Sequence, residues 1–211
     1  MTSERTDDID MTRRDILKFL GAAPLAPFAI SLLDVERAST MASDALVSLN
    51  ERAQQFHPLF FNANEWKTVR VLSDLVIPRD ERSGGATDAG VPEFMDFILR
   101  EYDNMQSWMR TGLAWLDAES GRRQATAFAL ATHAQQTAIL DEIAWPKKAP
   151  AEMKDGVAFF SRFRDLTSSG FWSSRMGVRD LRYMGNTALA SWPGCPPAAL
   201  RKLGVSYTKH S

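Results

Sequence analysis

Few residues of this chain have types and spacings that could support chemistry. The three histidines, His57, His133 and His210, are far apart in the sequence. None forms the i, i+4 pair that would turn two imidazoles toward one metal ion from a single helical face. His133 is better explained as a polar residue of a helix. The histidines therefore predict no metal site.

The neighbouring carboxylates and the single cysteine also give no catalytic arrangement. Asp141 and Glu142 are adjacent, and adjacent helical residues point about 100° apart, so the two do not face a common substrate. Cys195 stands in a Pro-Gly-Cys-Pro-Pro turn without a neighbouring base that would activate its thiol. One cysteine cannot form an intrachain disulfide or a thiolate cluster for zinc, iron–sulfur or haem. We interpret Cys195 as an inert thiol.

The glycines of the segment 84–90 do not form a dinucleotide site. Gly84, Gly85 and Gly90 lack the G-x-G-x-x-G spacing, and they lie between two expected helices rather than between a strand and a helix. A turn explains them better. Together with the residues above, they lead us to predict no catalytic residue, no metal and no bound cofactor in this chain.

The composition indicates a globular protein without affinity for nucleic acid. Of the 211 residues, 45% are hydrophobic and 24% are charged, which is typical of a chain that folds by burying apolar surface. The formal net charge is −1, and basic residues are interspersed with acidic ones, so no extended positive field would attract nucleic acid. The length suits one domain after a targeting segment is set aside.

The stretch Thr-Arg-Arg-Asp-Ile-Leu-Lys near the N-terminus resembles the twin-arginine export signal of bacteria. The residues that carry this pattern are Arg13, Arg14, Leu17 and Lys18. The apolar run that follows, residues 19–33, is too short to cross a hydrocarbon core of about 30 Å comfortably, so it reads as a signal region and not as a membrane anchor.

An amphipathic first helix is the alternative explanation of this segment, but Pro24 and Pro27 would break such a helix. The cleavage site is poorly defined, because Glu36 and Arg37 stand where small residues are expected and the candidates around Ala38 are imperfect. The signal therefore either stays attached or is cut inefficiently. We expect residues 1–42 to be a twin-arginine signal with a flexible segment, and residues 43–211 to form one helical domain.

Hydrophobic spacing predicts an all-α, compact domain of about four to six helices, because no alternating strand pattern is visible. Expected helices cover residues 44–55, a stretch from an Asn62/Glu65 capping box to Ile77, a continuous helix over 91–116, a weaker one over 122–143, and one over 155–170. Residues 79–90 form a loop. From about residue 171 the chain is rich in Gly, Pro and Trp, and we expect an irregular C-terminal arm.

Two expectations concern side chains around these helices. The aromatic segment 56–61 suits a linker pressed into a hydrophobic groove. On the helix over 91–116, an apolar face is opposed by a polar face that includes Asp96, Arg100, Asp103 and Arg110. We therefore expect Asp96 to lie on the solvent side.

Three stretches together give the chain a resemblance to the gluconate 2-dehydrogenase subunit 3 family. They are Leu-Ser-Asp-Leu-Val-Ile-Pro (72–78) with its loop into Ala-Gly-Val-Pro-Glu-Phe (89–94), Gln-Gln-Thr-Ala-Ile-Leu (135–140), and the phenylalanine-rich run 159–171 with the later Tyr-Met-Gly-Asn (183–186). None is a cofactor fingerprint, so the specificity lies in their co-occurrence and order. The resemblance extends over residues 66–196.

The resemblance implies a non-catalytic small subunit of a periplasmic or membrane-associated sugar dehydrogenase. In that family the FAD and the oxidation of a sugar or glycoside hydroxyl belong to a large partner of the glucose-methanol-choline (GMC) type, which lacks its own signal. The small subunit stabilises this partner and takes it through the twin-arginine translocase. A cytochrome c electron acceptor is a further candidate member of the complex.

Aromatic residues and prolines outside the clearest helix faces are the expected partner interface. These candidates are Pro78, Pro92, Phe171, Trp172 and Trp192, together with the loop between the two prolines. Two other functions remain open from the residues alone: a free-standing periplasmic helical protein whose aromatics line a pocket for an apolar ligand, and an enzyme with an unrecognised acid–base pair.

Overall fold

The computed structural model describes residues 31–51, 56–183 and 194–207. In these ranges the chain forms eight α-helices, two short 3-10 helices and no strand, which confirms the all-α prediction. The elements are α2 (Leu32–Glu51), α3 (Ala63–Val76), α4 (Val91–Glu101), α5 (Asp103–Gln124), η1 (Phe128–Leu130), α6 (His133–Ile143), η2 (Ala151–Met153), α7 (Lys154–Ser173), α8 (Arg175–Asp180) and α9 (Pro197–Leu203). No helix within the described ranges is both long and apolar enough to span a bilayer.

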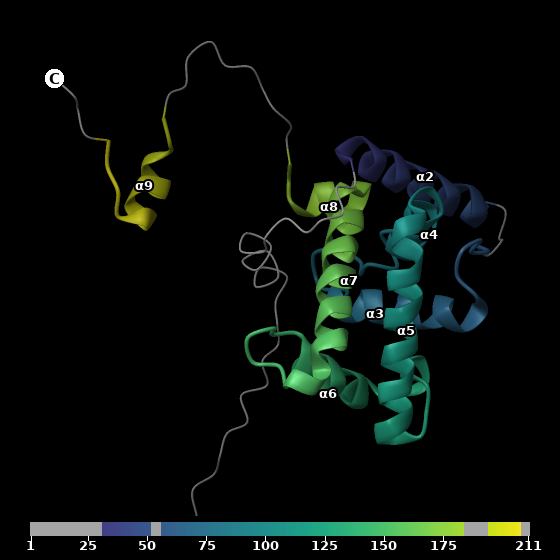
Figure 1. Ribbon diagram of the computed structural model, residues 1–211. Helices are drawn as coiled ribbons and strands as arrows, with labels where there is room; N and C mark the ends of the chain where they lie inside the picture. The colour runs from purple at the N-terminus through teal and green to yellow at the C-terminus, as the bar shows by residue number, and fades with distance from the viewer. Residues whose placement is uncertain (1–30, 52–55, 184–193, 208–211) are drawn as a thin grey trace, which may run out of the picture.

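Helix α7 lies at the centre of the helical bundle (Figure 1). It contacts α5, α4, α2, α3 and α6, and α8 follows directly at its C-terminal end. Helix α2 crosses near α4 and the end of α7, while α6 packs near the start of α7 (Figure 1). The buried apolar side chains of these helices form one continuous core. None of the residues of α9 is buried.

Helix α3 begins and ends where the sequence predicts. The Asn62 side chain accepts hydrogen bonds from the backbone N–H groups of Asn64 and Glu65 at 2.9 and 3.0 Å, and the Glu65 carboxylate accepts from the Asn62 N–H at 2.9 Å. This reciprocal capping box satisfies amide groups that have no partner inside the helix. The helix ends at Val76, two residues before Pro78.

The continuous helix predicted over 91–116 is wrong, because the chain breaks at Tyr102. The backbone there has φ −119° and ψ 81°, which separates α4 from α5. The Tyr102 hydroxyl donates to the Asp34 carboxylate of α2 at 2.5 Å, and the Gln106 amide donates to the Leu99 carbonyl at 2.7 Å. The Gln106 side chain thus satisfies a carbonyl near the break, and Asp34 of α2 holds the side chain of the tyrosine at the break.

Asp96 is fully buried, so the expectation that it faces solvent is also wrong. Its carboxylate accepts hydrogen bonds from the backbone N–H groups of Leu59, Phe60 and Phe61 at 3.1, 2.9 and 3.3 Å. Three donors on one carboxylate offset the cost of burying its charge. The aromatic segment is held against the domain as expected, with the Phe60 and Phe61 side chains buried.

Helical structure extends further at both ends than the sequence indicates. Helix α2 begins at Leu32, and its Ala38 and Ala42 are buried in the core. At the other end, α7 continues to Ser173 and α8 to Asp180, so the expected start of the irregular arm at about residue 171 is wrong. The predicted helix over 122–143 is interrupted by η1, with α6 starting only at His133.

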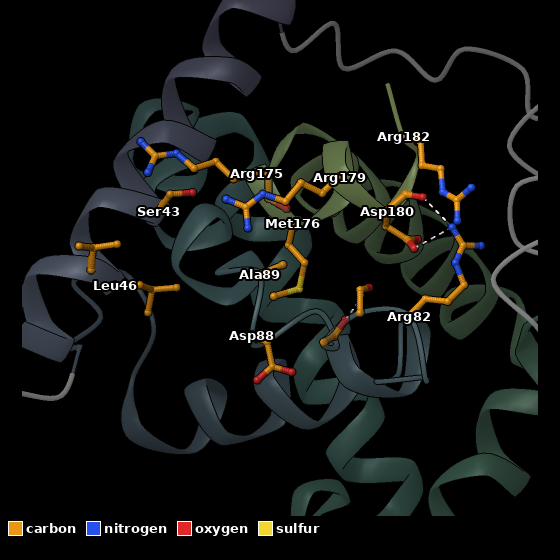
Figure 2. Close-up of a pocket in the computed structure, with 14 residues that line it drawn as sticks. Ser43, Leu46, Arg82, Asp88, Ala89, Arg175, Met176, Arg179, Asp180 and Arg182 are labelled. Carbon is orange, nitrogen blue, oxygen red and sulfur yellow. Dashed lines mark hydrogen bonds and ion pairs between the residues drawn. The ribbon is translucent and has the colours of Figure 1, made fainter. Parts of the chain in front are cut away.

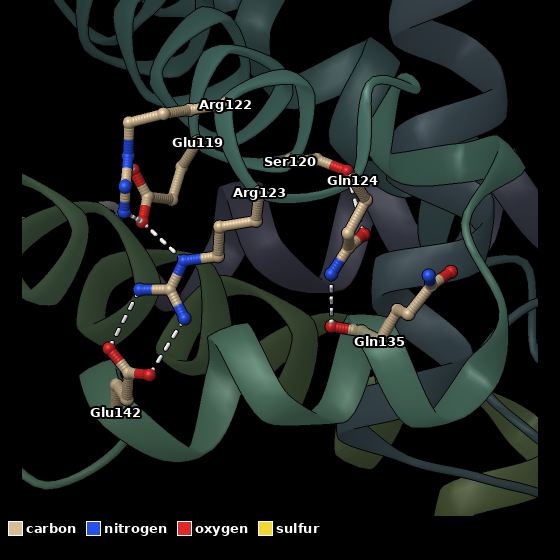
Figure 3. Close-up of polar contacts among 7 residues, drawn as sticks. All are labelled: Glu119, Ser120, Arg122, Arg123, Gln124, Gln135 and Glu142. Carbon is tan, nitrogen blue, oxygen red and sulfur yellow. Dashed lines mark hydrogen bonds and ion pairs between the residues drawn. The ribbon is translucent and has the colours of Figure 1, made fainter.

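An ion-pair network joins α5 to α6 (Figure 3). The Arg123 guanidinium donates to both oxygens of Glu142 at 2.7 and 2.8 Å. Glu119 accepts hydrogen bonds from Arg122 and Arg123, and these lower the pKa of its carboxyl to about 2. Asp141, next to Glu142, is exposed, as expected for a solvated surface carboxylate.

Glycines opposite aromatic rings allow α7 to approach α5 and α4 closely. A Cβ atom on Gly112 of α5 would lie 1.8 Å from the Phe159 ring of α7, and one on Gly156 of α7 would lie 2.2 Å from the Trp115 ring of α5. Real Cβ contacts are never so short, so these positions accept only glycine without movement of the helices.

The substitution Gly112→Ala is therefore expected to lower the free energy of unfolding by about 1–3 kcal/mol, because the added methyl group displaces Phe159 from the core. Gly121→Ala on the same helix is the control. A Cβ there has open space around it, so this change should raise the free energy of unfolding by about 0.5–1 kcal/mol. Urea unfolding of both variants measures this, and equal effects would contradict the packing argument.

Candidate functional site

A groove of about 610 Å³ lies between α2, the loop 77–90 and α8. Figure 2 shows side chains from all three elements converging on it. Its lining combines four arginines with two aspartates, small polar residues and a few apolar side chains: Ser43, Leu46, Val47, Arg82, Ser83, Gly84, Asp88, Ala89, Ser174, Arg175, Met176, Arg179, Asp180 and Arg182. None of these lining residues is aromatic, so the groove does not match an aromatic pocket for an apolar ligand.

Two carboxylates give the loop 77–90 a defined shape. Asp74 of α3 accepts from the backbone N–H and the hydroxyl of Thr87 at 2.8 and 2.6 Å. Asp88 accepts from the Gly85 N–H at 2.7 Å. The loop ends at Gly90, whose φ of 79° is a conformation that favours glycine. The loop therefore presents its side chains to the groove from a fixed backbone.

The turn between α7 and α8 places α8 beside the loop. The Ser174 hydroxyl caps α8 by accepting from the Gly177 N–H at 3.0 Å. A Cβ on Gly177 would lie only 2.0 Å from the Phe171 carbonyl oxygen, so a glycine is required for α8 to pack this closely on the end of α7. The position of the α8 arginines thus follows from the position of α7.

Arg82 joins the loop to α8. Its guanidinium donates to the Asp180 carbonyl oxygen at 2.6 Å and lies 3.0 Å from the Asp180 carboxylate (Figure 2). A guanidinium that binds a carbonyl in the last turn of a helix also interacts favourably with the negative end of the helix dipole. This contact closes one side of the groove.

The other three groove arginines, Arg175, Arg179 and Arg182, are not neutralised by a strong ion pair within the described residues. Arg175 lies 3.4 Å from Asp44, and both side chains are about two-thirds exposed, so this ion pair is weak. Arg179 and Arg182 form no ion pair with any residue that the structure describes. The arrangement can therefore bind anionic groups.

The residues predicted for a partner interface are only partly at this groove. Pro78 is exposed in the loop that lines it, whereas Pro92 is buried in the first turn of α4. Phe171 is fully buried in the core, and Trp172 is half-buried with its ring 4.9 Å from that of Phe171. Because both residues are buried, Pro92 and Phe171 cannot contact a partner chain. Trp192 lies outside the described residues.

The export residues Arg13, Arg14, Leu17 and Lys18 also lie outside the described residues. The groove arginines of α8 were not predicted from the sequence. Arg175 and Arg179 are spaced i, i+4, which could have indicated a basic helical face, whereas Arg182 lies beyond the end of α8. This spacing was missed because that part of the chain was expected to be irregular.

Acidic and metal-binding residues do not form a second site in the described part of the chain. It contains no group of three His, Cys, Asp or Glu side chains that could hold a metal ion. Glu93 of α4 is buried, with one carboxylate oxygen lacking a hydrogen bond and Arg70 at 3.7 Å from the other. Burial raises the pKa of this carboxyl, and a backbone hydrogen bond and the charge of Arg70 offset the shift only in part. Glu93 does not line the groove.

Because the pKa of Glu93 is higher in the folded chain than in the unfolded one, the carboxyl lowers stability as the pH rises above its ordinary range. Glu93→Gln should therefore raise the free energy of unfolding relative to the wild type at about pH 7, and the difference should shrink toward about pH 4. Glu101→Gln, at the exposed end of the same helix, is the control and should have little effect. A Glu93→Gln loss of stability that is equal at both pH values would contradict this account.

A family model described as gluconate 2-dehydrogenase subunit 3 matches residues 63–194, which include α3 to α8, the loop 77–90 and the groove arginines. No curated protein and no solved structure matches the chain. The family match covers more than half of the sequence, and it agrees with the resemblance carried by the three stretches described above. The chain belongs to the gluconate 2-dehydrogenase subunit 3 family.

Proposed function

We propose that this chain is the non-catalytic small subunit of an exported sugar dehydrogenase complex. It binds and stabilises a large FAD-dependent GMC-type oxidoreductase that oxidises a hydroxyl of a sugar or glycoside, and a cytochrome c receives the electrons. The observation that carries the proposal is the family match over residues 63–194. A family described as a subunit implies a partner, and the chemistry then belongs to that partner.

The groove supports a binding role. Arginine side chains on α8 offer hydrogen-bond donors in a fixed planar arrangement, and they recognise carboxylates on another chain well. Beside them, Leu46 and Met176 supply a small apolar surface. This mixture of apolar contact with charged groups at the edge is typical of protein interfaces.

The N-terminal sequence supports export by the twin-arginine pathway, which carries proteins that are already folded. Helix α2 starts at Leu32 and buries Ala38 and Ala42 in the core. Cleavage between these alanines would remove the first turns of α2, including the buried Ala38 and the Asp34 carboxylate that binds Tyr102. We therefore propose that the signal of the folded chain stays attached or is cut before α2, and that the complex works in the periplasm, at the membrane where the signal is retained.

The proposal is tested by purifying the tagged full-length chain from the periplasm of its own host. We expect a stoichiometric, yellow large chain to co-purify and to oxidise a sugar with an artificial electron acceptor, because the flavin belongs to the partner. A chain that purifies alone and colourless would contradict the proposal. A lone chain that itself oxidises a sugar would support the free-standing enzyme instead.

The double change Arg13→Lys, Arg14→Lys should abolish export of both chains, because the translocase recognises the arginine pair. The measurement is dehydrogenase activity in the periplasmic and cytoplasmic fractions. Arg201→Lys, in the exposed Arg-Lys pair of α9, is the matched control and should leave export intact. Undiminished periplasmic activity in the double variant would exclude the escort role.

A further inference from the structure

The C-terminal end of α8 has a backbone conformation that glycine normally supplies. Arg182 has a φ of 52°, in the left-handed region. The Arg182 N–H donates to the Arg179 carbonyl at 3.0 Å, and the Tyr183 N–H donates to the Val178 carbonyl at 3.2 Å. This pair of hydrogen bonds is the Schellman ending of a helix, in which a left-handed residue other than glycine lowers stability.

Helix α9 shows the same ending with the expected residue. Gly204 has a φ of 66°, its N–H donates to the Arg201 carbonyl, and the Val205 N–H donates to the Leu200 carbonyl. The same turn is thus built in this chain both with glycine and with arginine. Arg182 therefore keeps a backbone conformation that glycine would adopt at a lower cost in stability.

The Arg182 side chain lines the groove on the side of Arg82 and Asp180, while Arg175 and Arg179 line it from the other side of α8 (Figure 2). Neither Arg182 nor Arg179 has a carboxylate partner among the described residues. The lining holds four arginines and two aspartates, a net charge of +2, while the whole chain has a net charge of −1. The groove is therefore a locally positive surface on a nearly neutral molecule, and its charge is complementary to an acidic ligand.

We propose that this groove is the docking site for an acidic segment of the catalytic partner, with Arg179 and Arg182 binding its carboxylates. The inference rests on the proposed function, because it takes the partner to be the large subunit. Leu46, Val47 and Met176 in the same groove receive an apolar side chain of that segment. Guanidinium groups bind carboxylates through two parallel hydrogen bonds, which gives the contact orientation as well as affinity.

The test uses the full-length chain with its co-purifying large subunit and compares three variants. Arg182→Gly removes the guanidinium and relieves the left-handed backbone. Arg179→Gln removes the neighbouring charge without changing the backbone. Ala125→Gly is the matched control, because Ala125 is the other described non-glycine residue with positive φ, at 55°, and it ends α5 outside the groove.

We expect Arg182→Gly and Ala125→Gly both to raise the Tm of the small subunit, by about 2–4 °C, because each replaces a strained residue by glycine. Only Arg182→Gly and Arg179→Gln should weaken the complex, each by about tenfold in Kd at low salt. This difference from the wild type should shrink as salt screens the charges.

Three results would overturn the docking site while leaving the proposed function intact. One is a complex of Arg182→Gly or Arg179→Gln that is as tight as that of Ala125→Gly, with the wild type still bound to its yellow partner. A second is weakening that does not depend on salt. A third is a lower Tm for Arg182→Gly, which would show that arginine serves the fold. A wild-type chain with no large subunit would remove the proposed function and this inference together.

Discussion

Close packing of glycine against aromatic rings determines where α7 lies, and the other helices are arranged around it. Gly112 of α5 faces an aromatic ring of α7, and Gly156 of α7 faces an aromatic ring of α5, so each helix accommodates a ring of the other. Gly170 of α7 receives the Phe94 ring of α4 in the same way. Because a single methyl group at these positions would collide with a ring, the distances between α7 and its neighbours have little freedom. The ends of α7 are therefore placed accurately in the domain.

The candidate site depends on that placement. Gly177 lets α8 turn back tightly at the end of α7, and Arg82 then joins the loop 77–90 to Asp180. Asp74 holds the loop through Thr87. The groove is thus assembled from three segments that are distant in the sequence, on a rigid support. A rigid surface loses little conformational entropy on binding, which suits the proposed role as a partner-binding subunit.

The parts of the fold that the sequence predicts well are those decided by neighbours in the chain. The Asn62 capping box, the end of α3 before Pro78 and the start of α4 near Pro92 all rest on contacts within a few residues. The errors have the opposite origin. Tyr102 breaks the 91–116 helix while bonded to Asp34 of α2, and Asp96 is buried because it binds a segment more than thirty residues away.

The sequence by itself determined the helical class, the family and the absence of a recognisable catalytic motif, since composition, periodicity and the three family stretches are properties of the chain order. Only the tertiary structure decided that Phe171 belongs to the core and that Arg179 and Arg182 stand in a shared groove with the loop 77–90. The physical reason is that the burial of a side chain and the clustering of charges depend on which helices pack together. In this protein, glycine–aromatic contacts between helices that are distant in the sequence determine that packing.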